Sequence, residues 1–241
     1  MVYIDSHCHL FEVKDYVLPQ DIYPVIVGYS HGSNKKAFEL AKKYSYPFAL
    51  GIAPQSTIKE GISHLDQWVE FIRSSKPNAV GEVGLDYKWA TNLEHVKMQK
   101  KTFSAMISLS EELDVPVVIH SRNNPTENEV PKNAIDDVIK MVEERPFLMH
   151  FYSGNYEQAL RIVQMGGYIS ILAMRSKERR KVIESVPLER LLIESDCPYV
   201  GRTPDLIKDA VSYIAEIKKL DHNLVEEQTA KNTQKFFGFK M

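Results

Sequence analysis

Short runs of hydrophobic residues alternate along this chain with longer segments that are hydrophobic on one side only. The runs are nearly continuous in Val, Ile and Leu, which is typical of parallel strands covered on both faces. They predict eight strands, at residues 2–6, 24–28, 48–52, 79–83, 116–119, 147–150, 167–171 and 191–195. The amphipathic segments predict helices at residues 33–44, about 61–74, 93–113, 133–144, 156–165, 177–184, 204–219 and about 224–236.

Regular alternation of strands and helices is the pattern of βα units joined into a parallel sheet. Eight units in 241 residues predict an α/β fold, a (β/α)8 TIM barrel, with residues 1–241 forming one domain. The alternative is an open doubly wound sheet, which should carry a glycine-rich turn after its first strand. The sequence His7-Cys8-His9-Leu10-Phe11 stands there instead, so the barrel is favoured.

The composition is that of an ordinary globular protein, with 44% hydrophobic and 26% charged residues. A net charge of -2 gives no overall positive field, so any polyanion must be held by local cations. The two cysteines predict free thiols in a reducing cytoplasm. Without an export signal or a run of about 18 apolar residues, we expect a cytoplasmic protein that does not span a membrane.

The first predicted strand ends in two histidines, His7 and His9, one residue apart. Strand side chains alternate between faces, so Asp5, His7 and His9 are expected on one face. Two imidazoles so placed can share a metal ion, and Asp5 would accept the free N–H of one of them and fix its tautomer. The competing interpretation is two unrelated polar histidines near a strand end.

Three further strands end in residues able to bind a metal ion. Glu82 lies within an apolar run, where a carboxylate needs a cation, and one carboxylate can bridge two metals. An exposed glutamate on an edge strand is the alternative. His120 and His150 end the fifth and sixth strands. A single histidine there is more often structural, but two in equivalent places favour a site.

The eighth predicted strand carries Glu194 and Asp196 on one face. Asp196 is placed to bind a metal, to accept a proton from water, or both, with Glu194 supporting the site from behind. A helix N-cap role for Asp196 before Pro198 is the alternative.

These side chains all follow the carboxyl ends of strands, which converge on one mouth in a barrel. Nitrogen and oxygen ligands without a thiolate suit Zn, Mn, Co, Ni or Mg. The predicted ligands are His7, His9, Glu82, His120, His150 and Asp196.

The same residues carry a resemblance to the TatD-type metal-dependent deoxyribonucleases of the amidohydrolase superfamily, over nearly the whole chain. It rests on five ordered motifs: DSHCHL at 5–10, GEVGLDY at 81–87, VIHSR at 118–122, HFYSG at 150–154 and ESDCPY at 194–199.

The resemblance implies a barrel holding two divalent cations. One would be bound by His7, His9 and Asp196, the other by His120 and His150, with Glu82 bridging both. It also implies hydrolysis of DNA phosphodiester bonds, often as a 3′ to 5′ exonuclease, by in-line attack of a hydroxide that the two metals activate. Glu82 and Asp196 are then the catalytic carboxylates, and Asp196 handles the proton.

Departures from the family pattern concern the substrate. Ala53 stands where members commonly have a histidine before the proline, and the basic stretch after Tyr199 is shortened. Expected substrate contacts near the mouth are Arg122, Arg175, Arg202 and Tyr87. The basic run 179–181 is expected to be the solvated face of a helix.

Two other functions compete with DNA hydrolysis. The same metals could hydrolyse a small phosphoester, a phosphotriester, an amide or a lactone, although no lysine occupies the strand ends where several of those enzymes carry one. A non-catalytic scaffold is disfavoured, because all six ligands are retained. The expected partner is DNA or a small phosphoester, and no obligate protein partner is implied.

Overall fold

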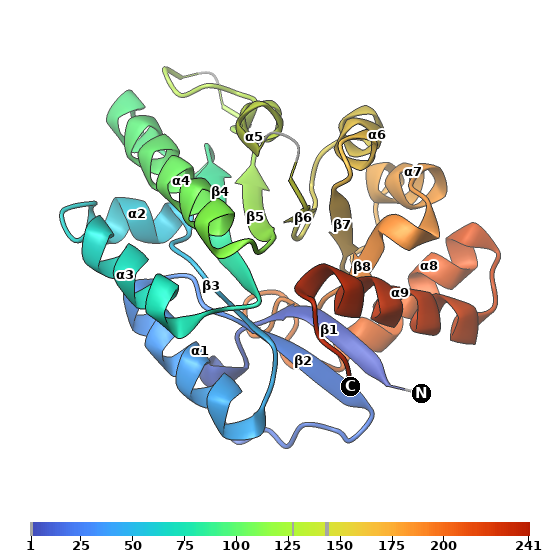
Figure 1. The fold of residues 1–241 in the computed structure, drawn as a ribbon. Coiled ribbons are helices and arrows are strands. Elements are labelled where there is room, and N and C mark those ends of the chain that lie inside the picture. Colours follow the sequence, from blue (N-terminus) through green and yellow to red (C-terminus); the bar gives the residue numbers. More distant parts are fainter. Residues whose placement is uncertain (1, 127, 143–144) are drawn as a thin grey trace.

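Eight parallel strands surrounded by helices form a barrel in the computed structural model, which describes residues 2–126, 128–142 and 145–241 (Figure 1). Each strand pairs in parallel with the next, in the order β1 to β8. The strands are β1 (Tyr3–Cys8), β2 (Ile22–Val27), β3 (Phe48–Leu50), β4 (Ala79–Asp86), β5 (Val117–Arg122), β6 (Phe147–Met149), β7 (Tyr168–Ile171) and β8 (Leu191–Ile193). The predicted (β/α)8 barrel is confirmed, and all eight predicted strands are present within a few residues.

The barrel closes where the last strand meets the first. The Ser6 hydroxyl donates to the Ile193 carbonyl at 2.8 Å. Beyond β8, the Asp196 backbone N–H donates to the His7 carbonyl at 3.0 Å, and the His9 N–H donates to the Cys197 carbonyl at 2.8 Å. The seam between the two ends of the chain therefore passes directly through the residues predicted to bind metal.

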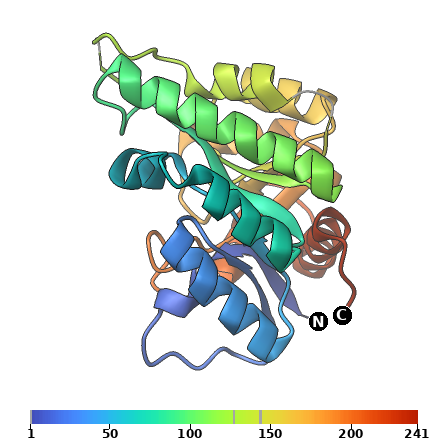
Figure 2. The ribbon, with the colours of Figure 1, turned by 60° about the vertical axis from the view of Figure 1, so that its left-hand side comes forward.

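Helices cover the outside of the barrel (Figures 1 and 2). They are α1 (His31–Tyr44), α2 (Pro54–Glu60), α3 (Leu65–Ser75), α4 (Leu93–Leu113), α5 (Ala134–Val142), α6 (Tyr156–Gln164), α7 (Lys177–Ser185), α8 (Leu206–Lys218) and α9 (His222–Phe237), with short 3-10 turns at Leu10–Glu12 and Leu188–Arg190. The sequence did not predict α2. The predicted end of the fifth helix, at 143–144, lies outside the described residues.

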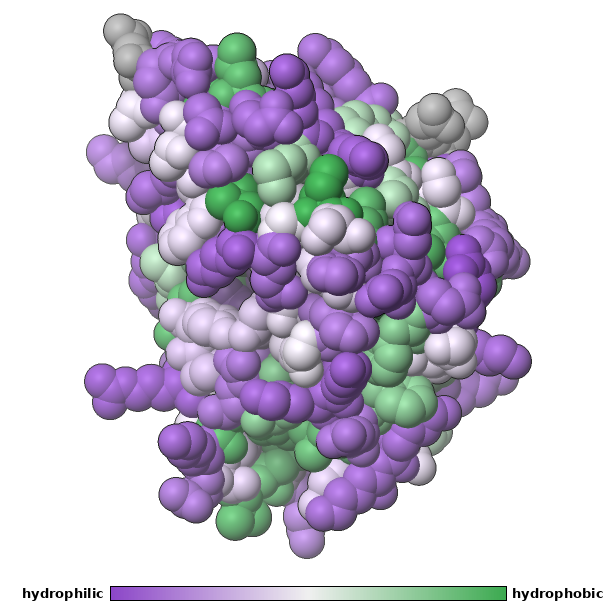
Figure 3. Space-filling model, turned by 90° about the vertical axis from the view of Figure 1, so that its left-hand side faces the viewer, coloured by the Kyte–Doolittle hydropathy of each residue, from purple (hydrophilic) through white to green (hydrophobic). Residues whose placement is uncertain are grey.

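Two hydrophobic layers hold the barrel together. Inside it, one side chain or two from each strand meet in a cluster that includes Val25, Val118 and Leu192. Phe236 and Phe237 of α9 join this cluster and close the end of the barrel opposite the strands' carboxyl ends. The larger cluster lies between strands and helices. None of the described helices combines the length and apolarity needed to cross a membrane, and the side of the surface in Figure 3 is mainly hydrophilic.

The strict alternation of side chains is interrupted in two strands. In β1, Asp5 and Cys8 are three positions apart, whereas their partners on β2 are two positions apart. β4 has the same shift against β5 between Val80 and Val83. An extra residue of this kind re-aims the side chains that follow it. Ile4 faces the interior, and the shifts bring His7 and Glu82 to the interior as well.

Gly84 in β4 provides a test of this backbone path. Its φ is +135°, and a Cβ there would lie 2.1 Å from the His120 carbonyl oxygen. Gly84→Ala should lower the free energy of unfolding by roughly 3 kcal/mol, from backbone strain and overpacking together. Urea denaturation measures this change. In the control Gly32→Ala, the added Cβ meets nothing within 4 Å, so the free energy of unfolding should stay the same or rise slightly. Equal effects of both variants would contradict the close approach of Gly84 to the His120 carbonyl.

Candidate metal centre

Six side chains from five strands of the barrel meet at its mouth. His7, Glu82 and His120 lie on β1, β4 and β5. His9 and His150 directly follow β1 and β6, and Asp196 is the third residue after β8. All are buried except His120, which is partly buried. The structure therefore brings together every residue predicted as a metal ligand.

Glu82 lies between two pairs of histidines. Its Oε2 is 3.6 Å from His7 Nε2 and 3.8 Å from His9 Nε2. Its Oε1 is 3.0 Å from His120 Nδ1 and 3.4 Å from His150 Nε2. Three of these separations exceed a normal hydrogen bond. Each carboxylate oxygen thus faces one histidine pair, an arrangement that suits a cation on either side.

Asp196 lies closest to the first pair, although its ligand atoms also lie within 4.8 Å of those of His7 and His150. Its Oδ1 lies 3.5 Å from His9 Nε2 and 4.0 Å from His7 Nε2. Potential ligand atoms of His7, His9 and Glu82 lie within 4.8 Å of one another, as do those of Glu82, His120 and His150. The site therefore has two halves that share Glu82.

Contacts on the far side of the rings orient three of the imidazoles. His9 Nδ1 is 2.6 Å from the Val27 carbonyl, which fixes Nδ1 as the protonated atom and leaves Nε2 free to bind a metal. His120 Nε2 is 2.9 Å from Asp86 Oδ2. His150 Nδ1 faces Glu194 Oε1 at 3.7 Å. Sequence reasoning missed Asp86, although it lies four residues after Glu82 in the same motif.

The donor atoms fit a divalent cation. Among the described residues, both ring nitrogens of buried His7 and the Nδ1 of His150 lack a hydrogen-bond partner. Buried polar atoms are rarely left unsatisfied, and imidazole with carboxylate is a ligand set that Zn, Mn, Co and Ni accept. A cation bound in the cluster would satisfy Nε2 of His7, the ring nitrogen that faces Glu82 and Asp196.

Protonation within the cluster supports the same conclusion. Burial alone would raise the pKa of Glu82, but His150 and the other imidazoles hold it well below its usual range. Burial opposes charge on His120 too, yet Asp86 and Glu82 raise its pKa to about 9. The pKa values of His9 and His150 are also raised, while burial lowers that of His7, so without metal the protons that balance the carboxylates lie on His9, His120 and His150. Because a metal must displace those protons, affinity should fall as pH falls.

Asp5 has a different role from the predicted one. Its Oδ1 accepts the backbone N–H groups of His7 at 3.2 Å and Ser195 at 3.0 Å, and its Oδ2 accepts the Ser195 hydroxyl. It also lies beside Cys8 and Cys197, because the bulge in β1 separates its direction from that of His7. Asp5 therefore fixes the backbone at the barrel seam and contacts no imidazole. Burial raises its pKa to about 7.

Glu194 is fully buried behind His150. Its Oε1 accepts the backbone N–H of Phe151 at 2.5 Å, and its Oε2 accepts the Ser170 hydroxyl at 2.6 Å. Phe151 adopts a left-handed φ of +43°. The carboxylate therefore fixes the turn that carries His150 and Phe151, the supporting place predicted for it.

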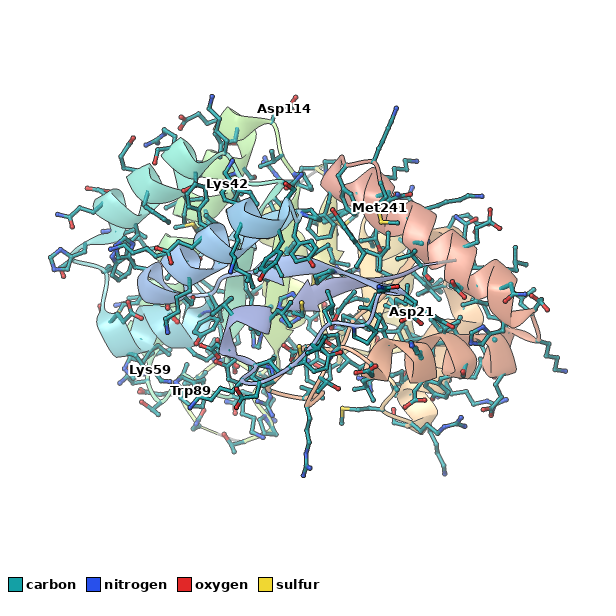
Figure 4. All side chains as sticks on the ribbon, turned by 90° about the horizontal axis from the view of Figure 1, so that it is seen from below. Asp21, Lys42, Lys59, Trp89, Asp114 and Met241 are labelled. Atoms are coloured by element: carbon teal, nitrogen blue, oxygen red, sulfur yellow. The ribbon has the colours of Figure 1, made fainter. Side chains whose placement is uncertain are left out.

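A cavity of about 330 Å³ opens above the cluster. Besides five of the six predicted ligands, it is lined by Tyr29, Ala53, Gln55, Ser56, Lys59, Trp89, Phe151 and Tyr199. Lys59 Nζ lies 5.3 Å from the centre of the Trp89 ring, and the two side chains lie together on the side of the molecule away from Asp114 (Figure 4). Lys59 was missed because α2 was missed.

The four predicted substrate residues do not line this cavity. Tyr87 is buried, and its hydroxyl donates to Asp137 Oδ2 at 2.7 Å. Arg175 pairs with both carboxylate oxygens of Glu216 at 3.1 and 2.6 Å. Arg122 and Arg202 are exposed and lie outside the cavity lining. Tyr87 is thus buried away from the cavity, contrary to the prediction, and the three arginines are not among the residues that line this cavity.

Two further lining residues, Tyr29 and Tyr199, lie beside His9 and come from different loops. The hydroxyls of Tyr29 and Tyr199 donate to the two carboxylate oxygens of Glu12 at 2.7 and 2.5 Å. The centres of both rings lie within 5.2 Å of the His9 ring centre. They form an aromatic wall that links the loops after β1, β2 and β8.

The barrel and the histidine–carboxylate cluster define a hydrolase of the metal-dependent barrel class. A family model described as TatD related DNase matches residues 4–238. A protein of Methanocaldococcus jannaschii, named as an uncharacterized metal-dependent hydrolase, is 32% identical over 98% of this chain and 96% of its own length. The chain therefore belongs to the TatD family of metal-dependent hydrolases.

More distant relatives agree with this family. Human deoxyribonuclease TATDN3 is 26% identical over 97% of this chain and 94% of its own length. The crystal structure of a TatD family hydrolase from Entamoeba histolytica superimposes with a TM-score of 0.81 at 18% identity, covering 98% of this chain and 97% of the other. The TatD homologue YJJV of Escherichia coli gives 0.76 at 22% identity, covering 99% and 98%. These two structures support the fold.

Replacing Glu82 tests the shared carboxylate. Glu82→Gln keeps the shape but substitutes an NH₂ group for one oxygen and removes the charge, so one half of the site loses a ligand. Metal bound after reconstitution with Mn or Zn, measured by elemental analysis, should fall by at least half. The control Glu226→Gln replaces another buried glutamate, on α9, and should bind metal as the unaltered chain does. Full retention by Glu82→Gln would contradict a bridging role.

Proposed function

We propose that this protein hydrolyses phosphodiester bonds of DNA, using two divalent cations held at the barrel mouth. The observation that carries the proposal is the position of Glu82, whose two oxygens each face a different histidine pair. Membership of a family described as TatD related DNase, and similarity to human deoxyribonuclease TATDN3, support DNA as the substrate.

The ligand assignment follows from which side chains face each other. His7, His9 and Asp196 would hold one cation, His120 and His150 the other, and Glu82 both. When bound, such cations stabilise negative charge on the phosphate and lower the pKa of water.

Asp196 is placed to accept a proton during the reaction. Its side chain lines the cavity. Burial alone would raise its pKa, but His9 at 3.5 Å and the nearby His150 and His7 lower it overall. The carboxylate is therefore ionised at neutral pH and can take the proton of a water that attacks phosphorus in the cavity.

The rest of the cavity suits one nucleotide. Its volume of about 330 Å³ is at the small end of ligand sites. Trp89, Phe151 and Tyr199 supply aromatic surfaces on which a base can stack. Lys59 brings a positive charge to a cavity whose other charged groups are the site's own. Ala53 leaves open the space where family members commonly carry a histidine.

Asp196→Asn tests the proton acceptor. The amide cannot take a proton from water, so release of nucleotides from 3′-labelled single-stranded DNA should fall at least about 100-fold. Metal content is measured on the same sample, because a loss of metal alone would also lower the rate. Activity close to that of the unaltered chain, with metal present, would contradict this role.

The same assay decides between DNA and a small substrate. The metal-stripped protein is reloaded singly with Mg, Mn, Co or Zn, and then given DNA, a small phosphodiester and a lactone. Metal-dependent release from DNA supports the proposal. Turnover of the small ester or the lactone without cleavage of DNA would assign the site to a small-molecule hydrolase.

A further inference from the structure

A second cavity, of about 310 Å³, adjoins the first. Phe151 lines both, so its side chain forms part of the wall between them. The remaining lining comes from the loop after β6, from β7 and the loop after it, and from the beginning of α7. The second cavity is therefore a neighbour of the cavity above the metal centre, with Phe151 between them.

Arg179 of α7 is turned toward this second cavity. The sequence predicted that residues 179–181 form a solvated face, which holds for Arg180 and Lys181: they are exposed and pair with Glu184 at 2.9 Å and Glu178 at 3.8 Å. The guanidinium of Arg179 instead donates to the carbonyls of Met174 at 2.7 Å and Tyr152 at 3.3 Å. It also lies 5.7 Å from the centre of the Phe151 ring. For Arg179 the prediction was wrong.

Burial lowers the pKa of Arg179, and the nearby charge of the Glu194 carboxylate only partly offsets this effect. Within the described part of the chain, no carboxylate lies within ion-pair distance of its guanidinium. Arg175, which also lines the cavity, is occupied by Glu216. The Glu178 carboxylate, a further lining group, accepts the backbone N–H of Tyr156 at 3.1 Å. Partly burying an unpaired cation is costly, so an anionic ligand in this cavity would stabilise it.

The two bonds to carbonyls leave further donors on the guanidinium. Arginine has five N–H donors in a planar fork that matches the oxygens of a phosphate. The carbonyls of Met174 and Tyr152 hold the group in place beside the cavity, so little side-chain freedom is lost when an anion binds. The Phe151 ring beside it offers a surface for a base.

We propose that the second cavity binds the phosphate next to the scissile one in a single DNA strand, with Arg179 as its contact. This inference rests on the proposed function and extends it. A strand would pass from the metal centre over Phe151 to Arg179. A small phosphoester, which has only one phosphate, would not use the second cavity, so Arg179 selects for a polymer.

Arg179→Gln tests this contact, because glutamine can still donate to one of the two carbonyls but carries no charge. On a single-stranded decanucleotide, kcat/KM should fall about tenfold or more, mainly through KM. On bis-p-nitrophenyl phosphate, which has one phosphate, the change should be less than twofold. The control Arg180→Gln removes a neighbouring exposed arginine of the same helix and should match the unaltered chain on both substrates.

Salt dependence gives a second readout that a structural role would not change. Each phosphate contact to a single strand contributes about -0.7 to the slope of log affinity against log salt concentration. The slope for 1/KM on the decanucleotide should therefore be shallower by about 0.7 in Arg179→Gln. Arg179→Lys, which keeps the charge, should recover most of this slope.

The outcomes separate the two proposals. A loss limited to the decanucleotide, with the shallower slope, supports the second cavity. Equal losses on both substrates, or no loss on the decanucleotide, would overturn it while leaving DNA hydrolysis intact. Failure of the unaltered, metal-loaded chain to cleave the decanucleotide would overturn the proposed function, and the inference with it.

Discussion

The structure depends on the buried Glu82 carboxylate, whose negative charge must be balanced by nearby positive charge. Glu82 of β4 is 6% exposed and is surrounded by four imidazoles, which come from β1 and the residue after it, from β5 and from the residue after β6. A charge removed from water in this way is tolerated only when opposite charge lies close to it. The compensation comes from strands on opposite sides of the barrel. The imidazoles therefore reach Glu82 only when the barrel has closed, so neutralisation of Glu82 depends on closure of the barrel.

The fold could be predicted from sequence because its pattern is local. Continuous apolar runs and amphipathic segments define strands and helices without knowledge of tertiary contacts, and all eight strands followed from them. Helix α2 did not, because seven residues beginning with Pro54 are too short for a periodic pattern. The bulges in β1 and β4 could not be predicted either, because an extra residue in a strand does not change the hydrophobic pattern in a recognisable way. They explain why Asp5 faces away from His7.

The metal centre was predictable for a different reason from the substrate contacts. Each candidate ligand ends a strand, and the topology of a barrel alone brings such positions together. An arginine or tyrosine has a long side chain whose direction depends on partners far away in sequence. Arg175 forms an ion pair with Glu216 of α8, and the buried Tyr87 donates a hydrogen bond to Asp137. The inward position of Arg179 likewise depends on two carbonyls that no sequence pattern identifies.

The contact between β1 and the segment after β8 has a consequence for folding during synthesis. His7 and His9 precede Asp196 and Cys197 along the chain and are therefore synthesised before them. The backbone bonds that join His7 to Asp196 and His9 to Cys197 can form only once β8 and the residues after it have been made. A chain still emerging from the ribosome therefore holds histidines and Glu82 without the strand that completes their arrangement. A metal-dependent hydrolase assembled in this order would complete its histidine–carboxylate cluster only when β8 and the residues after it dock against β1.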